Sequence, residues 1–267
     1  MSRLSTGAFA VLVAATIGAF FVTQHLKSAT PLIQGFPAFV PGTINPVHAV
    51  RCGKYNSGSA MISFYLQNRS DDVDAYVVRE ETGAIVDTLA TSRHMRTYHR
   101  FPDGLFRWNG RESNGQLAPD GTYYLRVALL HQGATINLNG SQQVVKVKTV
   151  PPHPVITRVS PSVIPAGSGS RRVTIQYTGN ENRGGTILLY RTGGSGAPRL
   201  VKAFLTPWTG HTAVWDGTVR LGQPAPPGTY LLALQVSDAA CNTGRYPASI
   251  PPAPGLGGES DTTVTVQ

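Results

Sequence analysis

The stretch Trp108-Asn109-Gly110, followed by Gly115 and by Pro119-Asp120-Gly121-Thr122-Tyr123, occurs a second time in the chain. The second copy is Trp215-Asp216-Gly217, then Gly222, then Pro226-Pro227-Gly228-Thr229-Tyr230. The spacing within the two copies is identical, and the copies lie 107 residues apart. A repeat of this length corresponds to one small domain, so the sequence predicts two copies of a single module.

The repeated residues are typical of structure rather than of chemistry. A tryptophan is large enough to fill the space between two small sheets, an Asx side chain stabilises a turn, and glycine accepts positive φ. A tyrosine at the start of the next strand resembles the tyrosine corner of Ig sandwiches. We therefore assign a structural role, and no catalytic role, to Trp108, Gly110, Gly115, Pro119, Gly121, Tyr123, Trp215, Gly217, Gly222, Pro226, Gly228 and Tyr230.

Short apolar runs separated by turn residues fill both halves of the chain and predict β-strands. In the first half we expect strands at 47–51, 61–66, 74–79, 85–89, 105–108, 122–129 and 143–148. In the second half we expect them at 155–159, 173–177, 186–191, 200–204, 212–215, 230–236 and 262–266. Many short strands indicate an all-β protein with two tandem Ig-like antiparallel β-sandwiches.

The N-terminus carries an uncharged apolar run, residues 4–23, which is about 30 Å long as a helix and so just spans a bilayer core. An uncleaved signal-anchor is expected, because Lys27 makes the nearby cleavage site poor; a cleaved signal peptide and a buried core helix are the alternatives. Either export signal places the chain from about residue 30 outside the cytoplasm, in a single-pass membrane protein or, after cleavage, as a secreted one.

The expected domain organisation has five parts. They are a transmembrane helix (1–27), a Pro- and Gly-rich stalk (28–45), a first Ig-like domain (46–150), a Pro-rich linker (151–154) and a second Ig-like domain (155–267).

The pattern W-[ND]-G-x4-G-x3-P-x-G-x-Y resembles the Ig-like domain of the flagellar hook-capping protein, the FlgD Ig-like family. The resemblance covers both halves, from about residue 46 to residue 267. It implies an Ig-like fold and an extracytoplasmic setting, in a module that serves structure or assembly and has no active-site residues.

The chain has 23 basic and 14 acidic residues, a net charge of +9, which suits an anionic partner such as a cell-wall polymer. The densest cationic segment is 93–100, and Arg93, Arg96 and Arg100 are candidate anion contacts; an ordinary exposed loop between strands is the alternative. No nucleic-acid-binding module is recognisable, so DNA and RNA are not expected partners.

The sequence contains no nucleophile elbow, zinc-binding His-Glu-x-x-His, phosphate-binding loop or Cys-x-x-Cys pair. We therefore expect no enzymatic activity, no cofactor and no metal. The expected function is that of a membrane-anchored spacer or binding module at the cell envelope; the alternative is an accessory or binding region of an envelope enzyme or assembly, contacting an envelope protein or an anionic polymer.

Two cysteines far apart in sequence, Cys52 and Cys241, predict one disulfide in an exported protein. Cys52 follows the expected first strand, at the end of domain one that faces domain two. Cys241 follows the long strand 230–236, in a loop that faces domain one. A bridge would fix the angle between the domains; two unrelated thiols or an intermolecular bond are the alternatives.

Overall fold

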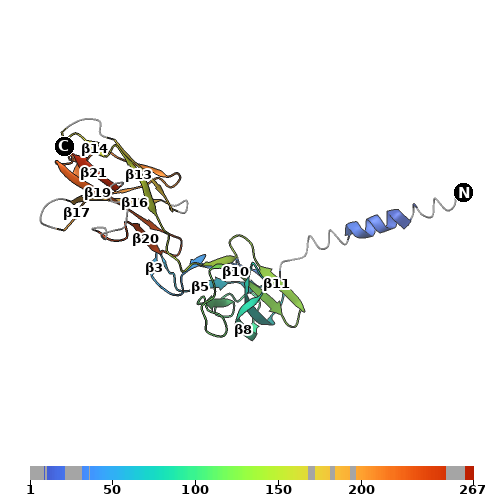
Figure 1. Cartoon of the computed structure of the whole chain (residues 1–267). Helices are drawn as coiled ribbons and strands as arrows, with labels where there is room; N and C mark the ends of the chain where they lie inside the picture. Colours follow the sequence, from blue (N-terminus) through green and yellow to red (C-terminus); the bar gives the residue numbers. More distant parts are fainter. Residues whose placement is uncertain are drawn as a thin grey trace.

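The computed structural model describes residues 9, 11–21, 32–35, 37–167, 172–180, 184–192, 197–250 and 262–267. Residues 11–21 are helical, and the ends of the expected apolar span lie outside the described residues. Within the described part of the chain, no helix combines the length and the apolar character needed to cross a membrane. The rest of the described chain folds into β-structure arranged as two bodies end to end (Figure 1).

The first body has its own hydrophobic core, formed by residues between Ile33 and Val147. Its strands are β1 (Ile33–Gln34), β2 (Thr43–Ile44), β3 (Arg51–Cys52), β4 (Tyr55–Asn56), β5 (Ala60–Ser63), β6 (Tyr65–Leu66), β7 (Asp71–Arg79), β8 (Ile85–Met95), β9 (Leu105–Trp108), β10 (Gly121–Leu129), β11 (Ala134–Leu138) and β12 (Val144–Val147). The larger sheet has the spatial order β2-β12-β10-β7-β8, with β11 paired to β10, and β5 pairs with β9 in a separate sheet.

The second body has a separate core, formed by residues between Ile156 and Val266. Its strands are β13 (Val155–Ser160), β14 (Val163–Ile164), β15 (Val173–Thr178), β16 (Gly185–Thr192), β17 (Arg199–Leu205), β18 (Thr212–Trp215), β19 (Gly228–Ser237), β20 (Thr243–Tyr246) and β21 (Thr263–Val266), with a 3-10 turn η1 (Arg220–Gly222). The larger sheet has the order β14-β21-β19-β16-β17, with β20 paired to β19, and β13-β15-β18 forms the other sheet.

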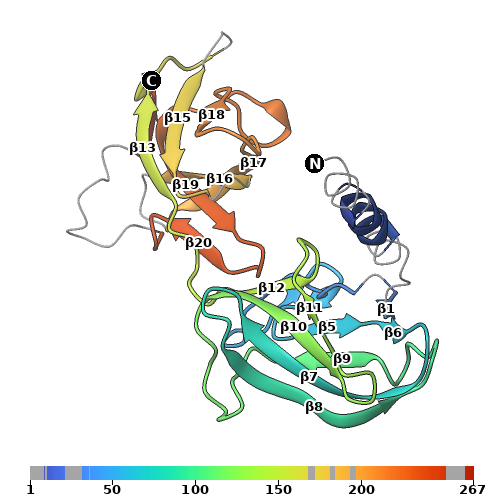
Figure 2. The ribbon, with the colours of Figure 1, turned by 90° about the vertical axis from the view of Figure 1, so that its right-hand side faces the viewer.

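The larger sheets of the two bodies share one strand order, and in each the strand that comes first in the sequence pairs in parallel with the strand that comes last. β2 lies parallel to β12, and β14 lies parallel to β21. All other ladders between named strands are antiparallel. Each body is therefore an Ig-like β-sandwich, as the sequence predicted, and the second view shows the two layers of each (Figure 2).

The two copies of the repeated motif make the same contacts. Trp108 is buried, and its Nε1 donates to the carbonyl of Arg111 at 2.8 Å. Trp215 is buried in the same way, and its Nε1 donates to the carbonyl of Thr218 at 2.7 Å. The turn after each tryptophan places Gly110 at φ +73° and Gly217 at φ +71°, a region that suits glycine.

The tyrosine of each copy closes the same corner. The Tyr123 hydroxyl donates to the Pro119 carbonyl at 2.6 Å, and the Tyr230 hydroxyl donates to the Pro226 carbonyl at 2.7 Å. Each ring packs on its tryptophan, with ring centres 4.8 Å apart in the first sandwich and 5.5 Å in the second. The tyrosine-corner geometry expected from the sequence is present twice.

Several strand predictions require correction. The expected first strand at 47–51 is wrong, because the Asn45 side chain accepts the amides of Val47 and His48 and so holds a turn there. The segment 28–45 was expected as a stalk, but Phe39 and Ile44 are buried in the first core. Residues 90–95, expected in a loop, extend β8 and pair with β7.

Candidate functional site: the junction between the sandwiches

The two sandwiches meet where the β3–β4 hairpin of the first reaches the β19–β20 turn of the second (Figure 1). The hairpin is short, with Cys52 opposite Tyr55 and Gly53 at φ +63° in the turn. Cys241 lies in the turn after β19, with its own φ at +62°. These two turns bring together residues that are 189 positions apart in the sequence.

Cys52 and Cys241 form a disulfide, with their Cα atoms 5.7 Å apart. This confirms the pairing expected from the sequence. The strand placement behind that expectation was only partly right, since Cys52 lies in a small hairpin and β20 follows Cys241 directly. No strand was expected between the strands 230–236 and 262–266, yet β20 lies there and pairs antiparallel with β19.

A buried polar network lies beside the disulfide. Asn45 of the first sandwich donates from Nδ2 to Oδ1 of Asn242 in the second, at 2.5 Å. The Asn242 amide in turn donates to the Lys148 carbonyl at 3.0 Å and to the Asp238 carboxylate at 2.9 Å. Asn45, Asp238 and Asn242 are all buried. A buried polar group is costly unless it is hydrogen-bonded, so the bonds of Asn242 to Asn45 and to Lys148 favour the docked arrangement of the two sandwiches.

The buried carboxylate of Asp238 is fully partnered. One oxygen accepts the amides of Ala240 and Asn242, each at 2.9 Å, which shapes the turn that carries Cys241. The other oxygen lies 3.7 Å from Nζ of Lys148, at the end of the first sandwich. This ion pair therefore crosses the junction as well.

The linker backbone is seated against the second sandwich. A Cβ added to Gly244 would lie 1.8 Å from the Pro152 carbonyl oxygen, and one added to Gly179 would lie 2.1 Å from the His153 carbonyl oxygen. On the other side, the backbone amide of Thr149 donates to the Asp120 carboxylate of the first repeated motif. The linker is thus held at both ends by close backbone approach and by hydrogen bonds.

The candidate anion contacts have internal partners in the first sandwich. Arg96 forms a two-point ion pair with Asp103, with nitrogen–oxygen distances of 2.8 and 3.0 Å, and these hydrogen bonds hold the pKa of Asp103 well below its usual range. Arg93 donates to the carbonyls of Leu105 and Pro102. Anion binding at these arginines stays a prediction, and their observed role is to tie the loop after β8 to the sandwich.

Arg100 has the same kind of internal role. It donates to the hydroxyl of Ser63 at 2.9 Å and to the carbonyl of Gly35, so it joins the chain before β2 to the β5 edge.

The polar residues of the junction were missed in the sequence. Asn45 and Asn242 follow no motif, and asparagine in turns is ordinary. The one signal was the position of Asn242 directly after Cys241, a cysteine already expected at the interface.

No protein-family model and no curated protein matches the chain. Among solved structures it is similar to a marsupial T cell receptor, with 12% identity and a TM-score of 0.42 over 88% of this chain and 73% of that one. It is also similar to a chimeric titin Z1Z2 (12% identity, TM-score 0.29, 90% of this chain and 98% of that one). Latent PorU from Porphyromonas gingivalis matches at 11% identity and a TM-score of 0.30, over 86% of this chain and 20% of that one. At such TM-scores the similarities add nothing to the Ig-like fold that the strand order and the tyrosine corners establish.

Proposed function

We propose that the chain is a non-enzymatic spacer of the cell envelope, a rod of two FlgD-type Ig-like domains held outside the cytoplasm by an N-terminal membrane anchor. The junction carries this proposal. Two domains that are joined by a linker alone move relative to each other by default. Here a disulfide, a buried amide pair and a closely packed linker cross one joint. These links keep the two domains at a fixed distance and angle, which suits a spacer.

Two features support the extracytoplasmic setting. Disulfides persist in oxidising compartments and are rare in the cytosol, and the Cys52–Cys241 bond contributes to the joint itself. The apolar run at 4–23 precedes the sandwiches and has the length of a membrane span. Together they favour export of the chain with its N-terminus retained as the anchor.

The second candidate function is an accessory or binding region of an envelope enzyme or assembly, contacting an anionic cell-wall polymer. The net charge of +9 favours this alternative. The internal partners of Arg93, Arg96 and Arg100 argue against the 93–100 segment as its binding site.

Mass spectrometry of the native protein, combined with protease treatment of intact cells or spheroplasts, tests the proposal. We expect the membrane fraction to contain the protein with an intact N-terminus. We also expect an external protease to cleave the sandwiches once the disulfide is reduced. A mature N-terminus near Thr30 would contradict the anchor, and sandwiches shielded until the membrane is lysed would contradict the extracytoplasmic setting.

A further inference from the structure

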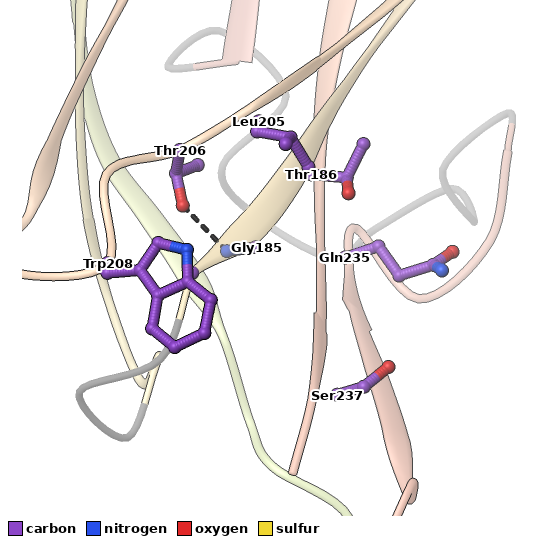
Figure 3. Close-up of a pocket in the computed structure, with 8 residues that line it drawn as sticks. Gly185, Thr186, Leu205, Thr206, Trp208, Gln235 and Ser237 are labelled. Carbon is purple, nitrogen blue, oxygen red and sulfur yellow. Dashed lines mark hydrogen bonds between the residues drawn. The ribbon is translucent and has the colours of Figure 1, made fainter. Parts of the chain in front are cut away.

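A hollow of about 340 Å³ lies on the outer face of the larger sheet of the second sandwich (Figure 3). It lies between the segment that follows β17 and the ends of β16 and β19. Ligand pockets commonly start at about 300 Å³, so the hollow is large enough for a small ligand or for one end of a chain-like one.

One wall of the hollow is apolar and unusually exposed. Trp208 is 78% exposed and Leu205 is 80% exposed, whereas Trp108 and Trp215 are 1% and 0% exposed. The segment that carries the exposed indole is anchored to the sheet. The Thr206 hydroxyl accepts the Gly185 amide at 2.7 Å, and a Cβ on Gly184 would lie 3.5 Å from Cδ1 of Trp208. The ring therefore presents its surface to solvent from an anchored segment.

The other wall is polar and is built on paired strands. Thr186 lies opposite Leu205 on one side and opposite Gln235 on the other, and Gln235 lies opposite Arg245. Nη2 of Arg245 donates to Oε1 of Gln235 at 2.8 Å, which leaves the amide nitrogen of Gln235 as a donor for a ligand. A site on strands is more rigid than one on loops, so these groups keep their spacing.

A second polar row lies one step along the same face. The hydroxyls of Ser237 and Thr243 lie 2.9 Å apart on paired strands. Ser237 lines the hollow, and Figure 3 shows it with Gln235 across from Trp208.

We propose that this hollow binds a neutral oligosaccharide. The indole face of Trp208 carries a negative quadrupole that attracts the C–H face of a pyranose ring, and Gln235, Ser237 and Thr186 supply uncharged hydrogen-bonding groups for the sugar hydroxyls. The side chains that line the hollow carry no charge, and the neighbouring guanidinium of Arg245 is hydrogen-bonded to Gln235, so the lining matches an uncharged ligand. Proline-rich peptides bind grooves lined by several aromatic rings, and here one ring faces a polar wall. The site goes beyond the proposed spacer function and does not depend on it.

The fluorescence of the full-length protein provides a direct test. The chain has three tryptophans, and a soluble quencher such as acrylamide reaches Trp208 while the other two are buried. The probes are chitotetraose, cellotetraose, maltotetraose and xylotetraose, with a decaproline peptide for comparison. We expect at least one of the four sugars to protect the exposed tryptophan from acrylamide in a saturable manner.

Variants assign the protection to the hollow. Gln235→Ala keeps the fluorescent reporter, and loss of its hydrogen bond is expected to raise the dissociation constant about three- to tenfold. Trp208→Ala, measured by calorimetry with the same sugar, is expected to weaken binding more than tenfold. Phe101→Ala removes a 61% exposed ring from the first sandwich and should leave binding unchanged.

Three results would overturn the proposal. They are protection by none of the four sugars, protection by decaproline alone, and protection by a sugar that survives both Gln235→Ala and Trp208→Ala. Circular dichroism of each variant separates lost binding from lost folding, because all the altered side chains are at least partly exposed and their removal should leave the spectrum unchanged.

Discussion

At the scale of single residues, each sandwich depends on one tryptophan and on the tyrosine that packs against it. Both side chains are large and buried, and each gives its polar end to a backbone carbonyl four residues or fewer away in the chain. The rings are thereby removed from water while every N–H and O–H group of these four side chains keeps a hydrogen-bond partner. This double requirement explains why the motif recurs with the same spacing.

Replacing Trp108 or Trp215 with alanine should destabilise the sandwich that contains it by about 3–5 kcal/mol, through lost burial and the cavity left behind. Guanidinium unfolding followed by circular dichroism measures the loss. Trp208→Ala is the matched control, since that ring is 78% exposed and surface changes usually stay within about 0.5 kcal/mol. Equal stability of a buried-site variant and the control would contradict the core assignment.

Asp216 differs from its counterpart Asn109 in carrying a charge. Both side chains accept the backbone amide two residues on, at 3.0 Å for Asp216 and 3.1 Å for Asn109, but Asp216 also pairs with Lys202 at 2.7 Å. Burial acts to raise the pKa of Asp216, and hydrogen bonds from Lys202 and Thr218 outweigh it and lower the pKa to about 2.

A carboxyl whose pKa is lower in the folded state stabilises the fold above its unfolded pKa, about 3.9, and loses this effect as the pH falls through about 2. Asp216→Asn keeps the turn and should flatten the dependence of the second sandwich's stability on pH between about 4 and 2. The variant should be slightly less stable than the parent at pH 7, by less than about 1 kcal/mol because Asp216 is 62% exposed, and the two proteins should converge as the pH falls to about 2. Parallel acid-unfolding curves for the two proteins would be the contrary result.

At the scale of elements, the sequence was informative for most strands of four or more residues and poor for two-residue ones. The expected strands at 105–108 and 212–215 match β9 and β18 residue for residue. β10 begins one residue earlier than expected, and β19 begins two residues earlier and ends one residue later. The two-residue strands β1 to β4 and β14 carry no readable alternation, because tertiary pairing alone makes them extended. β6 lies within the expected strand 61–66, which the structure divides into β5 and β6. β11 and β20 were missed for a related reason. Each is a short strand that folds back after a long one, β11 on β10 and β20 on β19, and its extended shape comes from that pairing.

β20 also shows why glycine is required at one position that no motif marks. A Cβ on Gly244 would meet the Pro152 carbonyl oxygen at 1.8 Å, so Gly244→Ala must displace either β20 or the linker. We expect a loss of about 1–3 kcal/mol, the usual cost of overpacking. Gly42→Ala is the control, because a Cβ there comes no closer than 4.0 Å to its nearest neighbour. Thermal unfolding measures both losses. Equal melting temperatures for Gly244→Ala and Gly42→Ala would contradict the close packing of the linker against β20.

At the scale of the whole molecule, the joint brings together turns that lie far apart in the sequence and share no motif. The meeting of the two cysteines could be inferred from the order of strands in an Ig-like fold, although the strand expected before Cys52 is a turn and Cys52 lies in a hairpin. The amide pair of Asn45 and Asn242 could not, since hydrogen bonds between distant turns depend on how two finished domains dock. The disulfide spans 189 residues, and in the chain-entropy description a loop of that length corresponds to about 5 kcal/mol.

Loss of one amide should weaken the joint without unfolding either sandwich. Asn242→Ala removes the donor to Asp238 and the partner of Asn45, and leaving buried polar groups unsatisfied costs about 1–3 kcal/mol. Hydrogen exchange should then speed up in the turns around Asn45 and Asp238 while the β10 and β19 amides stay protected. If exchange became faster throughout the second sandwich, Asn242 would stabilise that domain as a whole and not the joint specifically.

The rigidity of the joint is the central claim, and the distance between two equivalent surface positions measures it. Spin labels at Gln116 and Gln223, exposed positions in the two copies of the motif, report that distance by pulsed electron resonance on the full-length protein. We predict one narrow distance distribution for the oxidised protein and a broader one after Cys52→Ser and Cys241→Ser replacement. A broad distribution in the oxidised protein would show that the sandwiches move independently and would contradict the rod.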